Sequence, residues 1–227
     1  MMKKILLLLI AGLSISVHAQ KKASNPYGLQ VESYSDYLIA CKKNSNHQLL
    51  ELKKHIPGLV LDIKYATTDN FMKRIMYPQA RAFARKPVVL QLQKVQSELK
   101  KKGYGLKIFD AYRPYSITIA FYKEASNKAF VANPNKGSRH NRGCAVDLTL
   151  IDLKTGKELK MPTAYDSFSE QAAITYYKLP AEVIKNRLLL IQTMRKYGFN
   201  VLKNEWWHYD FVGWQNYNLM DIPFQKL

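Results

Sequence analysis

Four stretches of the chain are predicted to form β-strands, and the first alternates hydrophobic and polar positions largely as a half-buried strand does. They cover residues 59–65, 105–110, 144–151 and 206–211. In the third stretch the apolar residues share one face, so Asp147 and Thr149 point to the opposite one. This pattern predicts that a carboxylate leaves a core strand toward a cleft.

Apolar residues at helical spacing predict three helices between these strands. The first begins at Pro87, which suits a first helical turn, and stops at Gly103. The second is expected over residues 115–130, and the third runs from Pro180 to Gly198. Helices and mainly antiparallel strands in mixed order predict an α+β domain with a central sheet flanked by helices.

Residues 20–50 are polar and show no sustained period, so they are predicted to form an N-terminal arm. No repeat or low-complexity linker follows, which indicates a single domain over residues 51–227, long enough for one sizeable core. Two irregular excursions, at residues 66–85 and 152–180, interrupt the predicted elements. Long ordered excursions in compact domains are often functional.

Residues 1–19 are predicted to be a cleaved signal peptide. Lys3 and Lys4 precede an apolar run, and Val17-His18-Ala19 offers small residues where a signal peptidase requires them. The run is shorter than the ~20 residues of a membrane span; an uncleaved anchor is the alternative. The mature protein is therefore expected in the periplasm or envelope, without stable membrane insertion.

The formal net charge is +18, and +16 without the two lysines of the predicted signal. A strongly basic chain can bind nucleic acid, but an exported protein rarely meets it, so no nucleic-acid partner is expected. Cys41 and Cys144 are the only cysteines, and the sequence leaves open whether they form a disulfide. Cys144 begins an apolar strand and is interpreted as a small buried residue in preference to a soft metal ligand.

One imidazole and one carboxylate flank a predicted turn. His140 and Asp147 are seven positions apart, which in a continuous strand would place them on opposite faces. Gly143 can take the positive φ that folds the chain back, so both side chains can reach one ion. Downstream, Glu205 and His208 add a second carboxylate and a second imidazole.

Two His and one Asp are a sufficient ligand set for a catalytic zinc that keeps its fourth position open. The remaining Glu is then free to act as a base. Glu205 and His208 would diverge within a strict strand, so Glu205 is expected in the preceding turn. Spacing alone leaves chance pairing of His and acidic residues open. His47 and His55, each four positions from Glu51, are interpreted as ordinary helix-surface pairs.

A family resemblance rests on two motifs, Ser138-x-His140-x-x-Gly143-x-Ala145-x-Asp147 and Glu205-x-x-His208. Together they resemble the zinc D-alanyl-D-alanine dipeptidases of the VanX type, a family that shares a wider fold with the D,D-carboxypeptidases and the hedgehog signalling domain. Residues 61–71, 110–114 and 163–166 resemble further segments of the family in the same order. The resemblance covers about residues 60–211, and the combination is more specific than any one piece.

By this resemblance, the ligands of one Zn²⁺ per chain are His140, Asp147 and His208. Glu205 would be the general base and acid, taking a proton from water and passing it to the departing amine. Arg113 would hold the developing oxyanion, a role that suits a permanent charge with fixed donors. Asp166 would pair with the substrate ammonium, and Ser138 would add a polar contact.

The resemblance implies a secreted zinc metallopeptidase that hydrolyses the small dipeptide D-alanyl-D-alanine in cell-wall peptide turnover. A D,D-carboxypeptidase or endopeptidase acting on longer peptidoglycan peptides is the alternative within the fold, and Asp166 is expected to close the cleft against such peptides. A non-catalytic, zinc-containing cell-wall binding module is the alternative of another class. Glu205 argues against it, because a structural zinc needs no spare base. The sequence leaves the oligomeric state open.

Overall fold

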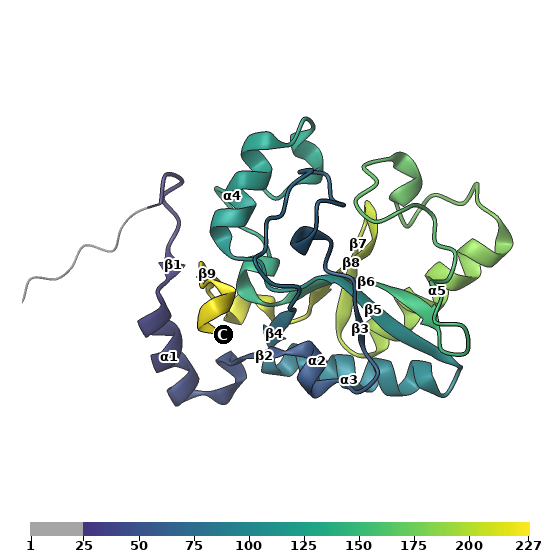
Figure 1. Ribbon diagram of the computed structural model, residues 1–227, viewed down its shortest axis with the longest axis horizontal. Helices are drawn as coiled ribbons and strands as arrows, with labels where there is room; N and C mark the ends of the chain where they lie inside the picture. Colours follow the sequence, from purple (N-terminus) through teal and green to yellow (C-terminus); the bar gives the residue numbers. More distant parts are fainter. Residues whose placement is uncertain (1–24) are drawn as a thin grey trace, which may run out of the picture.

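The computed structural model describes residues 25–227, so the predicted signal peptide lies outside the described part of the chain. The central sheet of this part has the strand order β3-β5-β6-β8-β7 (Figure 1). Its strands are β3 (Val60–Leu61), β5 (Tyr104–Asp110), β6 (Ala145–Asp152), β7 (Phe199–Leu202) and β8 (Glu205–Phe211). Within this central sheet only β3 and β5 pair in parallel, which confirms the α+β class with a mainly antiparallel central sheet.

Helices α3 (Lys86–Lys100) and α5 (Ala181–Lys196) contact each other and cover one face of the sheet (Figure 1). On this face Leu106 pairs with Leu150, and Ile108 pairs with Leu148 across β5 and β6. All four leucine and isoleucine side chains are fully buried, and burial of each contributes about 1.5–3 kcal/mol. The two predicted helices are confirmed with their proline starts and glycine stops.

The opposite face of the sheet carries α4 (Tyr115–Glu124) and a 3-10 turn at His140–Arg142. The predicted helix over 115–130 was too long. Ala125 leaves the helical conformation at ψ 130°, and the Asn127 side chain accepts a hydrogen bond from the Ala129 amide to start a separate short turn. A separate turn capped by Asn127 therefore takes the place of the last part of the predicted helix.

The predicted strand over 59–65 was also too long. Only Val60–Leu61 pairs with β5, and Lys64–Ala66 forms a 3-10 turn. The turn buries Tyr65 against Phe121, with ring centroids 4.6 Å apart. The chain therefore leaves the sheet early and places an aromatic side chain against α4. The local pattern of hydrophobic and polar residues could not predict this tertiary contact.

The segment predicted as an N-terminal arm contains regular structure from residue 31 onward. Strand β1 (Val31–Glu32) pairs in parallel with β9 (Leu219–Met220), and helix α1 (Tyr34–Lys43) follows it. Strand β2 (Leu49–Glu51) pairs antiparallel with β4 (Phe83–Arg85), and the short helix α2 (Leu52–His55) comes directly after β2. Strand β2 thus spans the predicted boundary between the arm and the domain. Within residues 25–227, no helix combines the length and the apolar character needed to cross a membrane.

Candidate active site

Two antiparallel strands and one turn bring the predicted ligands together. Asp147 in β6 is paired directly across the ladder with His208 in β8, so both side chains leave the sheet on the same face. His140 opens the 3-10 turn that precedes β6, and Gly143 ends this turn at φ 68°. The predicted fold-back at Gly143 is confirmed, and it explains how His140 and Asp147 meet despite their odd spacing.

The three side chains have the spacing of a metal shell. His140 Nε2 lies 3.2 Å from His208 Nδ1, and Asp147 Oδ1 lies 3.4 Å and 3.0 Å from these two nitrogens. Tetrahedral ligands on zinc, at bond lengths near 2.0–2.2 Å, are separated by about 3.3–3.6 Å, close to these distances. All three residues are buried. One nitrogen from each of two imidazoles and one carboxylate oxygen therefore fit a zinc ion.

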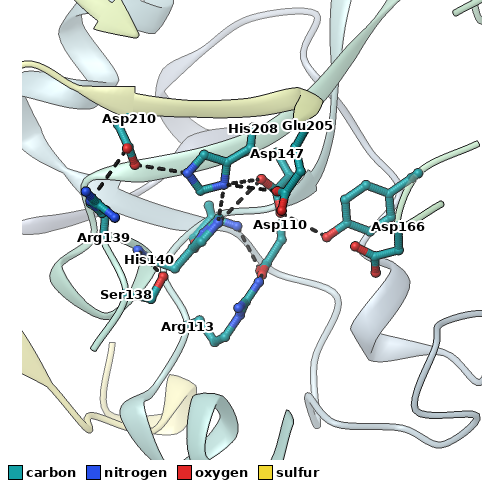
Figure 2. Close-up of polar contacts among 12 residues, drawn as sticks. Asp110, Arg113, Ser138, Arg139, His140, Asp147, Asp166, Glu205, His208 and Asp210 are labelled. Atoms are coloured by element: carbon teal, nitrogen blue, oxygen red, sulfur yellow. Dashed lines mark hydrogen bonds and ion pairs between the residues drawn. The ribbon is translucent and has the colours of Figure 1, made fainter. Parts of the chain in front are cut away.

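Each imidazole is oriented by a second acceptor on its far side (Figure 2). His140 Nδ1 lies 2.6 Å from the Ala111 carbonyl oxygen, and His208 Nε2 lies 2.9 Å from Asp210 Oδ1. Neither oxygen acceptor carries a proton to donate, so the imidazoles donate there. Their remaining nitrogens, His140 Nε2 and His208 Nδ1, face Asp147 on the other side of each ring, where they would offer their lone pairs to a bound metal.

Glu205 lies beside this cluster, with Oε2 3.9 Å from His208 Nδ1. The expectation that it sits in the turn before the strand was wrong, because Glu205 is the first residue of β8. The ladder between β7 and β8 is irregular at this point, pairing Val201 with Tyr209 but Leu202 with Glu205. This irregularity re-aims the strand and places Glu205 and His208 on the same side. Burial raises the pKa of Glu205, which suits a group that exchanges protons.

Arg113 follows β5 and is held by Asp110. Its Nε and Nη2 donate to Asp110 Oδ2 at 3.0 and 2.7 Å, and Tyr77 donates its hydroxyl proton to Asp110 Oδ1 at 2.9 Å. The guanidinium lies over the rings of Phe121 and Tyr65, at 4.7 and 5.4 Å. Burial lowers the pKa of Arg113, but Asp110 and the neighbouring tyrosines together raise it well above its usual value, so Arg113 is a fixed cation.

Asp166 adopts a left-handed conformation at φ 55°, and its carboxylate accepts a hydrogen bond of 2.7 Å from the Tyr65 hydroxyl. Burial raises its pKa well above the usual value, against the opposing effect of the Tyr65 hydrogen bond. Among residues 25–227, no cationic side chain forms an ion pair with the Asp166 carboxyl group. It is therefore ready to receive a positively charged group.

One cavity of about 200 Å³ brings together all seven residues that the sequence singled out, namely Arg113, Ser138, His140, Asp147, Asp166, Glu205 and His208. Pockets for drug-sized ligands are larger, at roughly 300–1,000 Å³, so this one suits a small molecule. Its apolar wall includes Phe71, Phe130 and Phe168, which come from three different loops. Phe168 stacks on Phe130 at 5.0 Å and meets Phe71 edge to face at 5.5 Å.

Several residues that shape the site were not predicted. Asp210 could have been found, because it lies two positions after His208 on a strand and therefore on the same face. Tyr165 donates its hydroxyl to Asp147 Oδ2 at 2.9 Å, and Tyr77 supports Asp110 from far away in sequence. Neither tyrosine stands in a pattern that marks it. Cys144 is fully buried, and both it and Cys41 are free thiols, so no disulfide joins them.

Known proteins resemble this chain over most of its length. Residues 45–226 match the family described as D-ala-D-ala dipeptidase. The D-alanyl-D-alanine dipeptidase of Escherichia coli (strain K12) is 33% identical over 78% of this chain and 91% of its own length. That of Enterococcus faecalis (strain ATCC 700802 / V583) is 31% identical over 72% of this chain and 91% of its own. The solved vancomycin-resistance D,D-dipeptidase VanXYg aligns with 18% identity and a TM-score of 0.38, covering 73% of this chain and 67% of that one.

Proposed function

This chain belongs to the D-Ala-D-Ala dipeptidase family, and we propose that it is a zinc metallopeptidase that hydrolyses free D-alanyl-D-alanine. The observation that carries the proposal is the cluster of His140, Asp147 and His208 with Glu205 directly beside it. A structural zinc site is closed by four protein ligands, whereas this arrangement supplies three and adds a base. That difference favours an enzyme over a non-catalytic binding module.

The proposed cofactor is one Zn²⁺ per chain, held by the two imidazoles and Asp147. Burial raises the pKa of Asp147, but the His140 and His208 imidazoles lower it further, so the carboxylate is ionised as a ligand must be. When bound, zinc polarises a carbonyl and lowers the pKa of water toward ~7.

The side chains of the cavity then have distinct tasks in the proposed reaction. Glu205 takes a proton from the attacking water and passes it to the departing amine. Arg113, fixed by Asp110, donates hydrogen bonds to the oxygen on which negative charge develops. Asp166 and the Tyr65 hydroxyl receive the substrate ammonium, and Ser138 supplies a further polar contact.

The alternative substrate is a longer peptidoglycan peptide, cut by a D,D-carboxypeptidase or endopeptidase. Both long excursions contribute to the cavity wall, Phe71 from the first and Asp166 and Phe168 from the second. An acylated amino group is neutral and would leave the Asp166 carboxylate without a partner when buried against it. The wall and its charge therefore favour a dipeptide with a free ammonium.

We also propose that the protein is exported and acts in cell-wall peptide turnover. The support for export is the sequence of residues 1–19, and the support for this role is the chemistry of the substrate.

Metal analysis of the purified protein, together with turnover of D-Ala-D-Ala and of an N-acetylated D-Ala-D-Ala peptide, tests the proposal. We expect about one zinc per chain and a clear preference for the free dipeptide. A preference for the acetylated peptide would overturn the dipeptidase assignment. Absence of both zinc and turnover would overturn the enzyme assignment itself.

A further inference from the structure

The substrate carboxylate has no partner among the roles assigned above. A free dipeptide carries an ammonium at one end and a carboxylate at the other, and the proposed function places only the ammonium. Among the described residues that line the cavity, the permanently charged cations are Arg113 and Arg139. Arg113 already has Asp110 as its counter-ion and is buried to 10% side-chain exposure. Arg139 keeps 44% of its side chain exposed.

Arg139 and Asp166 lie on opposite sides of the ligand cluster (Figure 2). His140, Asp147 and His208 lie between them in this view, and Ser138 lies beside Arg139. An extended dipeptide spans about 7 Å, with the scissile carbonyl near its middle. With the ammonium at Asp166 and the carbonyl at the ligand cluster, the carboxylate of the substrate points toward Arg139.

The Arg139 guanidinium is held in place by its neighbours but keeps hydrogen-bond donors available for a ligand. It lies over the Trp214 ring at 4.7 Å, and Nε lies 3.5 Å from Asp210 Oδ2. Trp214 is itself fixed, because the Arg142 guanidinium lies 5.3 Å from the ring centroid. Among residues 25–227, no side chain or carbonyl accepts a hydrogen bond from either Nη atom of Arg139. These two nitrogens can form the paired contact that a guanidinium makes with a carboxylate.

We propose, on the basis of the proposed function, that Arg139 binds the C-terminal carboxylate of the substrate and restricts the enzyme to peptides with a free C-terminus. Asp210 then has two neighbours to orient, His208 through Oδ1 and Arg139 through Oδ2. The Asp210 side chain thereby fixes the distance between the ligand cluster and the proposed carboxylate contact at Arg139.

The experiment compares D-Ala-D-Ala with its C-terminal amide in the zinc-loaded wild type, Arg139→Gln and Arg139→Lys. Loss of a charged pair of hydrogen bonds weakens binding by about 10- to 100-fold. In Arg139→Gln, kcat/KM for the free acid should therefore fall by this factor, mainly because KM rises. The wild type and Arg139→Gln should cleave the amide with equal kcat/KM. Arg139→Lys should recover part of the loss, since it keeps the charge without the fork.

Arg74→Gln is the control for charge, because Arg74 is an exposed arginine, paired with Glu124, that does not line the cavity. It should leave the preference for the acid unchanged. An equal loss with acid and amide in Arg139→Gln would mean that Arg139 acts through Asp210 on His208, and would overturn the proposal. If Arg139→Gln still prefers the acid to the amide as strongly as the wild type does, the proposal is also overturned.

Calorimetric binding of acid and amide to zinc-loaded Glu205→Gln protein, with and without Arg139→Gln, separates this inference from the proposed function. If the Glu205→Gln protein binds the acid more tightly than the amide and loses this preference with Arg139→Gln, while the wild type hydrolyses neither compound, the carboxylate contact is supported and the proposed enzyme activity is contradicted. A wild type that hydrolyses both with equal kcat/KM does the reverse.

Discussion

One carboxylate oxygen of Asp110 accepts two hydrogen bonds from the Arg113 guanidinium, from Nε at 3.0 Å and from Nη2 at 2.7 Å. Asp110 is 1% exposed, so the pair is shielded from water. Removing one partner of such a pair leaves an uncompensated charge in the interior, which typically costs 3–5 kcal/mol. The geometry therefore links the stability of the fold to the placement of the proposed oxyanion contact.

Replacing Asp110 with Asn should lower both stability and activity. We expect a loss of about 3–5 kcal/mol in the free energy of unfolding, measured by urea titration, and a fall in kcat of up to about 10²-fold with little change in KM. Arg74→Gln breaks a pair whose side chains are 52% and 46% exposed and should cost less than about 1 kcal/mol. Wild-type kcat in a folded Asp110→Asn protein would show that Arg113 needs no such support.

The sequence supports the ligand set well because its constraints are local. Gly143 permits the turn that His140 needs, and alternation in β6 sends Asp147 to the cleft. The contacts that hold Arg113 arise differently, since Tyr77 and Asp110 meet only through tertiary packing. The position of Glu205 was missed for a similar reason: a local irregularity in the pairing of two strands is set by both strands together.

Replacing Glu205 with Gln should remove proton transfer and leave the metal shell intact. Glutamine is nearly isosteric but cannot accept the proton, so kcat should fall by about 10²- to 10⁴-fold. Zinc content should stay near that of the wild type, because Glu205 is not among the three clustered ligands. Steady-state kinetics with metal analysis of the same sample measures both. Loss of zinc in this variant would instead make Glu205 a ligand.

Asp166 should make the stability of the zinc-free protein fall as the pH rises. Its folded pKa is raised by burial above the unfolded value of about 3.9, so the folded state binds the proton more tightly. The stabilising contribution is complete below about pH 3.9 and is lost as the pH rises through the folded pKa.

Asp166→Asn should therefore be more stable than the wild type at pH 7 and equal to it near pH 4, as measured by thermal unfolding across this range. Asparagine tolerates the left-handed conformation at φ 55°, so backbone strain does not confound the comparison. The same variant should cleave D-Ala-D-Ala poorly, because the ammonium loses its counter-charge. A parallel pH dependence in both proteins would contradict a raised pKa at this position.

We predict that the stacked pair of Phe168 and Phe130 limits the length of peptide that the cavity accepts. Phe168 follows Asp166 by two residues and lines the same cavity. Phe168→Ala removes the ring that contacts both Phe130 and Phe71 and should open the cavity at this end. We expect kcat/KM for an N-acetylated D-Ala-D-Ala peptide to rise at least about tenfold relative to that for the dipeptide, since even one methylene group in a pocket changes selectivity by about 1–3 kcal/mol. Phe168→Leu, which keeps most of the bulk, should stay close to the wild type.

An unchanged ratio in Phe168→Ala would place the barrier to longer peptides at Asp166 alone. The charge of Asp166 would then exclude the neutral acyl group without help from the aromatic wall.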